Sequence, residues 1–553
     1  MKYTKDRLTR QLTALVPAVV LLASGAPAQT GRLDFLKAKD SSFALFANTS
    51  ATFQTGSLYP NEVVLITGLP SNPVIAARVD IGVDKPLCSP GEPCGNIRSI
   101  ALSPDGDTAL VSSDPSGIQP PGDRGVSTLF VLRNVRAFVR SKNPGDLRIR
   151  KFRATDHPQL DNVSGLAFGP DGRWAVVNTI GPGPIDLTYK SARGTLVTIT
   201  GLPDNPVFSA PFQIPSHSQG NIDLSVDGET LVMNDVTNNT GPRTASSQIL
   251  VKGLRPGGFP PQIVGTASFE APENAIAATP VVRDARLSVD GRFVLAPSAL
   301  ILSLGPPPVG RSQIEILGPP RNGKLPLVRE LTPADGAEGG PYVAAVSPDG
   351  DSALIVNTLD QGGAKLLTGL GSGDPSKFQL KALPFAFFGP PFPLGPNGPP
   401  VFASHVEPKF TPDGETALVT SWINPGLVGL PLLPSISVLT GFRNGPIRVV
   451  SHLSSPTLNT FDYSTLIATV PTGLQDYVNL YLPAGAARNL LTSLLQDAIA
   501  KADRGDTTSS IVALVGFIGA AYGLEHQGIL SSGRTSTLVS QAGIGIQVLL
   551  THP

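Results

Sequence analysis

The sequence has few of the residues that cross-link a fold, bind metals or give a protein a net charge. Only two cysteines and six histidines occur in 553 residues, which excludes a cysteine-rich disulfide scaffold. The 42 basic residues balance the 42 acidic ones, and charged residues make up 15% of the chain. A nucleic-acid-binding protein would carry a basic excess. We therefore expect no nucleic-acid partner.

The recognisable catalytic motifs are also missing. The sequence contains no GxSxG elbow, no HExxH pair, no GxxxxGK[ST] loop and no CxxCH haem site. Its histidines are scattered without the spacing of metal ligands. We therefore expect no cofactor and no metal from the sequence.

Glycine and proline are abundant instead. The chain has 58 glycines and 55 prolines, which is about a fifth of its residues and nearly twice the usual share. With a hydrophobic content of 41%, this composition favours many short strands joined by turns. An all-β body is the expectation.

The N-terminus has the three parts of an export signal. Basic residues between Lys2 and Arg10 precede an apolar run over residues 12–23, and the small residues Ala26 and Ala28 mark a cleavage site. An uncleaved anchor is the alternative, but about a dozen apolar residues span a bilayer poorly. We predict a signal peptide over residues 1–28, a periplasmic or extracellular location, and no integral membrane span in the mature chain.

The two cysteines lie close together, at Cys88 and Cys94 in the segment CSPGEPC. In an exported protein this spacing favours a disulfide that closes a short loop. A zinc site would need further ligands, and the segment has none.

One motif recurs six times at intervals of 56 to 66 residues and sets the expected fold. Each copy has an apolar strand, a turn built on Asp-Gly, and a second apolar strand, which is a hairpin pattern. The turn aspartates could instead form a calcium site, but the Asp-rich loop with a distal glutamate is absent. We read them as turn formers: Asp105, Asp171, Asp227, Asp290, Asp349 and Asp413.

A second marker, strand–Gly turn–strand, follows each hairpin and occurs seven times, the first near Gly68. Seven units of about 60 residues with four antiparallel strands predict a seven-bladed β-propeller. The first unit lacks its Asp-Gly turn. Its inner strand comes either from residues 33–39 or from residues 465–470. We place the propeller at residues 29–460, a linker at 461–484 and a helical module at 485–553.

The motifs SPDGDTALV, SPDGDSALIV and TPDGETALV resemble the YVTN-type repeat of exported, lactonase-like seven-bladed propellers. The resemblance covers about residues 42–455 and implies the propeller fold. The tyrosine that the family has in the second strand is replaced here, by Ala, Trp, Leu or Phe. Because the matching residues are turn and strand residues, the resemblance leaves catalysis open.

After Pro456 the pattern becomes helical. Leu490, Leu494 and Ala498 fall on one helix face, Asp506 is a good N-cap, and a third helix is expected near Ser532. The segment is similar to the small helical modules, called FIMAH domains, that end many secreted bacterial proteins. Residues 511–524 carry no charge, and we interpret them as a buried bundle helix rather than a membrane span.

Charged residues alternate with apolar ones along the inner strands of several blades. Lone charges there are costly, so they either compensate one another or line a polar binding funnel. His405 and Glu407 could serve as a base and its partner in a hydrolase. The candidate ligand-binding residues are Arg98, Asp223, Arg283, Asp284, Arg286, Tyr342, His405 and Glu407.

Two apolar loops flank the last blade, at residues 383–400 and 423–434. By propeller topology both emerge on the face opposite the Asp-Gly turns. Exposed apolar patches mark contact sites, but these side chains could also fold back to seal the channel or cradle the helices. The candidate partner-binding residues are Phe385, Phe387, Phe388 and Phe392.

These features predict an exported, non-catalytic propeller that binds a protein or an extracellular polymer through its loop face. A lactonase-like or other hydrolytic propeller enzyme is the alternative. A cluster of arginine, histidine and carboxylates in one funnel would favour the enzyme. A broad apolar loop surface would favour the binding protein.

Overall fold

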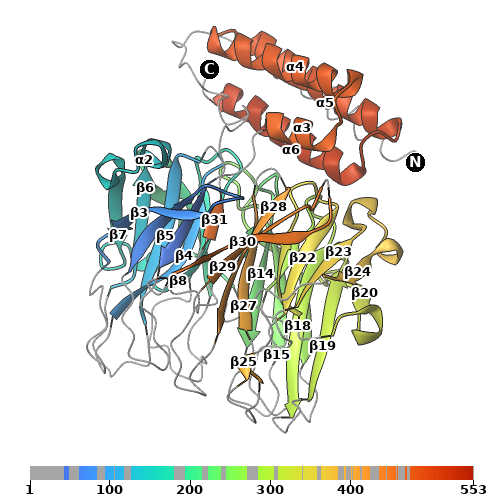
Figure 1. The fold of residues 1–553 in the computed structure, drawn as a ribbon. Helices are drawn as coiled ribbons and strands as arrows, with labels where there is room; N and C mark the ends of the chain where they lie inside the picture. Colours follow the sequence, from blue (N-terminus) through green and yellow to red (C-terminus); the bar gives the residue numbers. More distant parts are fainter. Residues whose placement is uncertain are drawn as a thin grey trace. The chain divides into compact units, whose positions relative to one another are not determined.

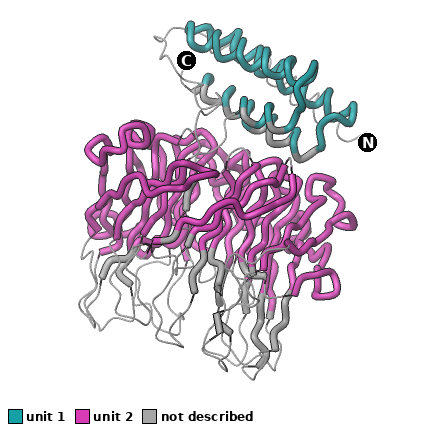
Figure 2. The backbone as a smooth tube through the Cα atoms, viewed as in Figure 1, with its two compact units in different colours: residues 1–40, 472–553 teal, residues 41–471 magenta. Residues whose placement is uncertain are grey.

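The computed structural model contains two compact units, residues 41–471 and residues 472–553 with 1–40 (Figure 2). The residues that the structure describes are 43–48, 61–83, 94–104, 106–116, 126–179, 194–214, 222–237, 245–270, 284–303, 309–338, 341–357, 363–383, 392–393, 400–401, 403–411, 414–423, 435–443, 445–455, 458, 467–469 and 474–551.

The larger unit is a seven-bladed β-propeller, as the repeat predicts (Figure 1). Each blade is an antiparallel sheet of four strands, counted from the innermost strand outward. In the third blade the outer strand is divided into two short pieces that both pair with β10. A separate two-stranded hairpin, β25–β26, precedes the last blade.

In the first four blades the strands from the innermost outward follow their order in the sequence, with one exception, β31. Blade 1 is β31 (Ile467–Thr469), β1 (Ala44–Asn48), β2 (Glu62–Thr67) and β3 (Val74–Asp80); blade 2 is β4 (Cys94–Leu102), β5 (Thr108–Ser116), β6 (Thr128–Arg133) and β7 (Arg148–Arg153); blade 3 is β8 (Val163–Phe168), β9 (Ala175–Thr179), β10 (Thr195–Thr200), β11 (Val207–Phe208) and β12 (Phe212–Gln213); blade 4 is β13 (Ile222–Leu224), β14 (Thr230–Thr237), β15 (Ala245–Lys252) and β16 (Gln262–Glu270). A short helix, α2 (Val135–Ser141), joins β6 to β7.

The other three blades are simple meanders. Blade 5 is β17 (Arg286–Leu287), β18 (Val294–Ser303), β19 (Val309–Leu317) and β20 (Leu327–Leu331); blade 6 is β21 (Pro341–Val346), β22 (Ser352–Asn357), β23 (Ala364–Thr368) and β24 (Gln379–Ala382); blade 7 is β27 (Ala403–Phe410), β28 (Thr416–Ile423), β29 (Ser435–Thr440) and β30 (Arg448–Ser454); β25 is Phe392–Pro393 and β26 is Pro400–Val401.

The ring closes with a strand from the far end of the unit. β31 pairs antiparallel with β1, Leu45 opposite Ala468, and contacts the inner strands β4 and β27 of the two neighbouring blades. Of the two predicted alternatives, the segment at residues 465–470 is therefore the correct one. This origin also explains the missing Asp-Gly turn, because the first two strands of blade 1 are not consecutive in the chain.

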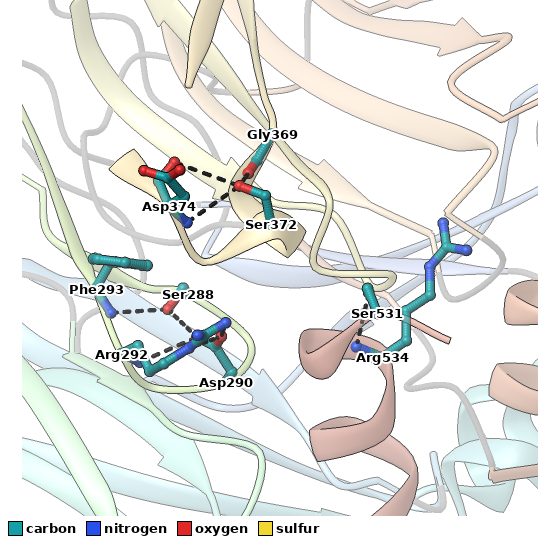
Figure 3. A network of polar contacts seen from close by, with 9 residues as sticks. All are labelled: Ser288, Asp290, Arg292, Phe293, Gly369, Ser372, Asp374, Ser531 and Arg534. Carbon is teal, nitrogen blue, oxygen red and sulfur yellow. Dashed lines mark hydrogen bonds and ion pairs between the residues drawn. The ribbon is translucent and has the colours of Figure 1, made fainter. Parts of the chain in front are cut away.

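The Asp-Gly turns join the first two strands of blades 2 to 7. All six turn glycines have positive φ, between 64° and 72°, which glycine adopts at little cost. In blade 5, Asp290 Oδ1 accepts the backbone N–H of Arg292 at 3.1 Å and the hydroxyl of Ser288 at 2.6 Å (Figure 3). Asp171, Asp227 and Asp349 accept equivalent N–H groups, so these carboxylates are turn formers as predicted.

Neighbouring turns pack against one another around the ring. A Cβ at Gly228 of blade 4 would lie 2.9 Å from both Pro170 Cδ and Trp174 Cζ2 of blade 3. A Cβ at Gly350 of blade 6 would lie 3.0 Å from Val289 Cβ of blade 5. These glycines therefore serve the turn conformation and the blade packing together.

Successive residues of each strand pack against opposite neighbouring blades, and an apolar cluster fills each interface. Between blades 4 and 5, for example, Val232 and Leu250 pack with Val294 and Leu317. Toward the strand ends away from the Asp-Gly turns, the buried second-strand residues become polar. They are Asn48, Ser112, Asn178, Asn234 and Thr420.

The smaller unit is helical. Its helices are α3 (Leu474–Tyr481), α4 (Ala486–Asp503), α5 (Thr507–His526) and α6 (Ser532–Thr551). Asp506 is the N-cap of α5, accepting the N–H of Ser509 at 3.0 Å, and α6 begins at the predicted Ser532. Residues 461–484, expected as a linker, in fact hold β31 and α3, because the ring needs its last strand and the bundle core takes Leu474 from α3.

Among the described residues, α5 is the one helix whose length and composition would allow it to span a membrane. It contributes Leu514 and Phe517, both fully buried, to the core of the helical unit. This packing is the arrangement expected of a bundle helix.

Candidate functional site

The inner strands of blades 4, 5 and 7 bring five charged residues together. Asp223 lies on β13, Asp284 lies two residues before Arg286, which begins β17, and Glu407 and Lys409 lie on β27. In each strand the charged residues alternate with apolar ones, such as the buried Ile222 and Ala285, which face the blade interfaces. We call Asp223, Asp284, Arg286, Glu407 and Lys409 the inner-strand charge cluster.

Asp284 and Arg286 bind the middle of the next blade's inner strand. Arg286 Nε donates to Asp284 Oδ2 at 3.0 Å and lies 3.1 Å from the carbonyl oxygen of Ala344 in β21. The N–H of Ala344 donates to the same Asp284 oxygen at 3.2 Å. Both side chains are more than nine-tenths buried. The pair therefore fixes blade 5 to the backbone of blade 6.

The cluster extends to blades 4 and 7 through the other two carboxylates. Glu407 Oε1 lies 3.8 Å from Arg286 Nη2 and 3.4 Å from Lys409 Nζ. Asp223 Oδ2 accepts the N–H of Leu287 at 2.7 Å. Four consecutive blades are thus linked by one polar network. The predicted compensation of charges by pairing is what these residues show.

Burial and pairing act in opposite directions on the ionisation of these groups. Burial alone would lower the pKa of Arg286, but the carboxylates of Asp284, Asp223 and Glu407 outweigh it and raise that pKa above its ordinary value. Burial raises the pKa of Asp223, although Arg286 and the N–H of Leu287 act to lower it. Arg286 is therefore a permanent cation, and burial makes Asp223 easier to protonate than an ordinary aspartate.

Four inner strands share an irregularity that the sequence did not reveal. The register shifts by one residue in β4 at Arg98, in β8 at Ser164, in β21 at Tyr342, and in β27 between His405 and Glu407. Each shift lies at the same distance before the Asp-Gly turn. A β-bulge of this kind interrupts the alternation of residues between the two faces of a strand. The alternation that would place His405 and Glu407 on one face is interrupted there.

The remaining predicted residues lie partly within and partly outside the described ranges. Arg98 is half-buried on β4, Tyr342 lies on β21 and His405 on β27, while Arg283 is outside the described residues.

Phe392 begins β25, but Phe385, Phe387 and Phe388 are outside the described residues, as is Cys88. Cys94 begins β4. The disulfide and the apolar loop surface stay predictions.

No group of three or more histidine, cysteine or acidic side chains within metal-binding reach occurs in the described part of the chain. Sequence reasoning singled out Asp223, Asp284, Arg286 and Glu407 of this cluster. It missed the Ala344 peptide, because backbone partners have no sequence signature. It also missed the buried Glu315 of β19, which a search for polar residues at apolar strand positions could have found.

Comparisons with known proteins find likenesses among solved structures alone. No protein-family model matches the chain, and no curated protein matches its sequence. Among solved structures, the chain is similar to a periplasmic gluconolactonase of Pseudomonas aeruginosa, with 16% identity, a TM-score of 0.43, and coverage of 78% of this chain and all of that one. It is also similar to a hypothetical selenium-binding protein of Sulfolobus tokodaii, with 11% identity, a TM-score of 0.46, and coverage of 78% and 93%.

Proposed function

We propose that this chain is an exported, non-catalytic binding protein, and that its propeller captures a protein or an extracellular polymer on the face opposite the Asp-Gly turns. The loops of that face are the ones after each second strand and those that join the blades. The export rests on the signal-like N-terminus at residues 1–28.

The observation that carries the proposal is the mutual pairing of the charge cluster. Asp223, Asp284 and Glu407 each have a cationic or backbone N–H partner inside the propeller. A general base has to be within hydrogen-bond reach of a substrate, and groups engaged in this way serve better to hold blades together. A structural role in a rigid propeller scaffold thus explains the pairing within the cluster.

The apolar loops supply the partner surface in this proposal. Residues 383–400 and 423–434 are rich in phenylalanine, leucine and proline, which is unusual for loops. Proline limits the conformational entropy lost when a loop is ordered by a partner. A rigid ring that presents such loops is suited to binding.

The test is replacement of Phe387, Phe388 and Phe392 by serine, with capture of partners from the native envelope or culture fluid as the readout. We expect capture to be lost while the thermal unfolding midpoint stays unchanged. Phe259→Ser is the matched control. Phe259 is 85% exposed in the turn between the third and fourth strands of blade 4, at the opposite end of the propeller. The control should capture the same partner as the unmodified chain.

A collapse of stability in the triple variant would mean that these phenylalanines are core residues, and the partner surface would be withdrawn. The hydrolytic alternative has one supporting feature, the partly exposed Asp223 with its raised pKa. Hydrolysis of a panel of sugar lactones, abolished by Asp223→Asn, would favour that enzyme over the binding protein.

A further inference from the structure

A second polar site lies between blades 4 and 5, away from the charge cluster. Val232 and Leu250 of blade 4 pack with Val294 and Leu317 of blade 5 in one apolar cluster. Residues two positions along a strand share a face. The same two facing surfaces therefore carry Asn234 and Gln248 from blade 4, and Ala296, Ser298, Gln313 and Glu315 from blade 5.

The polar side chains of this interface are buried almost completely. Asn234 and Gln248 have no exposed surface, and Glu315 is 1% exposed. Ser298 and Gln313 are also buried. Within blade 4, Gln248 Nε2 donates to Asn234 Oδ1 at 2.8 Å. Within blade 5, the amide of Gln313 donates to Glu315 Oε1, and the hydroxyl of Ser298 lies 3.3 Å from the same oxygen.

Three oxygen atoms of this set have no hydrogen-bond partner among the described residues. They are Gln248 Oε1, Gln313 Oε1 and Glu315 Oε2. All three are acceptors, and they come from both sides of the interface. A buried acceptor without a partner is destabilising, and more so when it is charged. Three such atoms on facing surfaces indicate a missing electropositive partner.

A proton on Glu315 would satisfy this set only in part. Its O–H could donate to one amide oxygen and would leave the other without a donor. A hard metal cation can contact all three oxygens at once, because such ions bind carboxylate and amide oxygens and accept six to eight of them in the case of Ca²⁺. The amide nitrogens already point to protein acceptors, which leaves the oxygens available.

We propose that blades 4 and 5 hold a hard metal cation, bound by Gln248 on one side and by Gln313 and Glu315 on the other. The ion joins the two blades beside the apolar cluster in which Val232 and Leu250 pack with Val294 and Leu317. With one carboxylate among the ligands, the affinity for Ca²⁺ falls in the weak range, with a Kd of about 10⁻⁴–10⁻³ M. Binding the folded protein alone then raises its unfolding midpoint.

The test uses the full mature chain in a buffer whose own cation is tetramethylammonium. Calcium chloride is titrated by calorimetry, and thermal unfolding is followed with 10 mM Ca²⁺, 10 mM Na⁺ or a chelator. We expect each chain to bind one ion and this binding to require Glu315. The unfolding midpoint with the ion should be about 2–4 °C higher than with a chelator. Gln248→Leu tests the ligand from blade 4 and should lose the same ion.

Glu330→Gln is the matched control, since Glu330 lies opposite Glu315 on β20 but is not fully buried. It should bind the ion like the unmodified chain, and Glu315→Gln should not. Binding of Na⁺ in place of Ca²⁺, with the same dependence on Glu315, also supports the site. The proposal is overturned if neither ion binds up to 10 mM, or if Glu315→Gln, folded by circular dichroism, binds as well as the unmodified chain.

Discussion

Two carboxyl groups show how burial within a propeller raises the pKa of an acid. Burial raises the pKa of Glu315 to about 7, although the amide of Gln313 and the hydroxyl of Ser298 act to lower it. Asp223 is shifted in the same direction by burial. The helix-capping Asp506 at the surface shows the reverse, since hydrogen bonds from Ser509 lower its pKa. Burial and hydrogen bonding, more than residue type, decide the direction in which each pKa moves.

The stability of the protein should depend on pH through Glu315. The pKa is near 4.5 in the unfolded chain and about 7 in the folded one, so the folded state favours the protonated acid. The loss of folding free energy that results from ionising Glu315 is absent below pH 4.5, grows as pH rises to 7, and then stays constant at about 3 kcal/mol. Urea unfolding with a chelator at pH 5 and pH 8 measures it.

Glu315→Gln removes this titration. We expect the variant to gain stability relative to the unmodified chain at pH 8 and to match it near pH 5. The nearby Glu330 adds repulsion to the ionised form, so Glu330→Gln should show a small change in the same direction. An equal difference between variant and unmodified chain at both pH values would contradict the assignment.

At the scale of the elements, the hairpin turns and the bulges have different origins. The Asp-Gly turn is local, because aspartate binds the backbone two residues on and glycine supplies positive φ. The inner-strand bulges are not local, since four strands with different residues, such as Arg98 and Ser164, shift at the same position. The bulge therefore follows the position in the blade and not the residue that occupies it.

The two roles of the turn glycines can be separated by alanine substitution. At Gly291 of blade 5 a Cβ would meet nothing within 4 Å, so only the positive φ of 67° is strained. We expect Gly291→Ala to cost about 1 kcal/mol. Gly228→Ala adds overlap with Pro170 and Trp174 and should cost about 1–3 kcal/mol more. Chemical denaturation of both variants measures the difference, and equal losses would refute the packing role.

At the scale of the whole molecule, long-range contacts close and brace the ring. β31 covers the edge of β1 after more than 400 residues of intervening chain. The charge cluster links blades 4 to 7 through Arg286, its carboxylate partners and the Ala344 peptide. Removing Arg286 alone would leave buried carboxylates uncompensated, which is more costly than removing the whole network.

Ring closure predicts where the chain can be shortened. A chain that ends at Pro471 keeps β31 and should unfold near the midpoint of the propeller in the full protein. A chain that ends at Ser464 loses β31, exposes the edge of β1, and should unfold at least about 5 °C lower or aggregate. Thermal unfolding followed by circular dichroism compares the two. Equal midpoints would mean that residues 33–39 can supply the inner strand instead.

The sequence by itself determined what depends on neighbouring residues. Turn chemistry repeated every 60 residues or so predicts seven four-stranded blades, and helical spacing with the Asp506 cap predicts the C-terminal helices. It also placed charges on the inner strands. The tertiary structure decided which strand closes the ring, where strands bulge, that Arg286 joins Asp284 to Glu407, and that blades 4 and 5 pack through the faces that carry Val232 and Leu317. Those features are contacts between residues far apart in the chain, and packing and burial, not local propensity, set their energies.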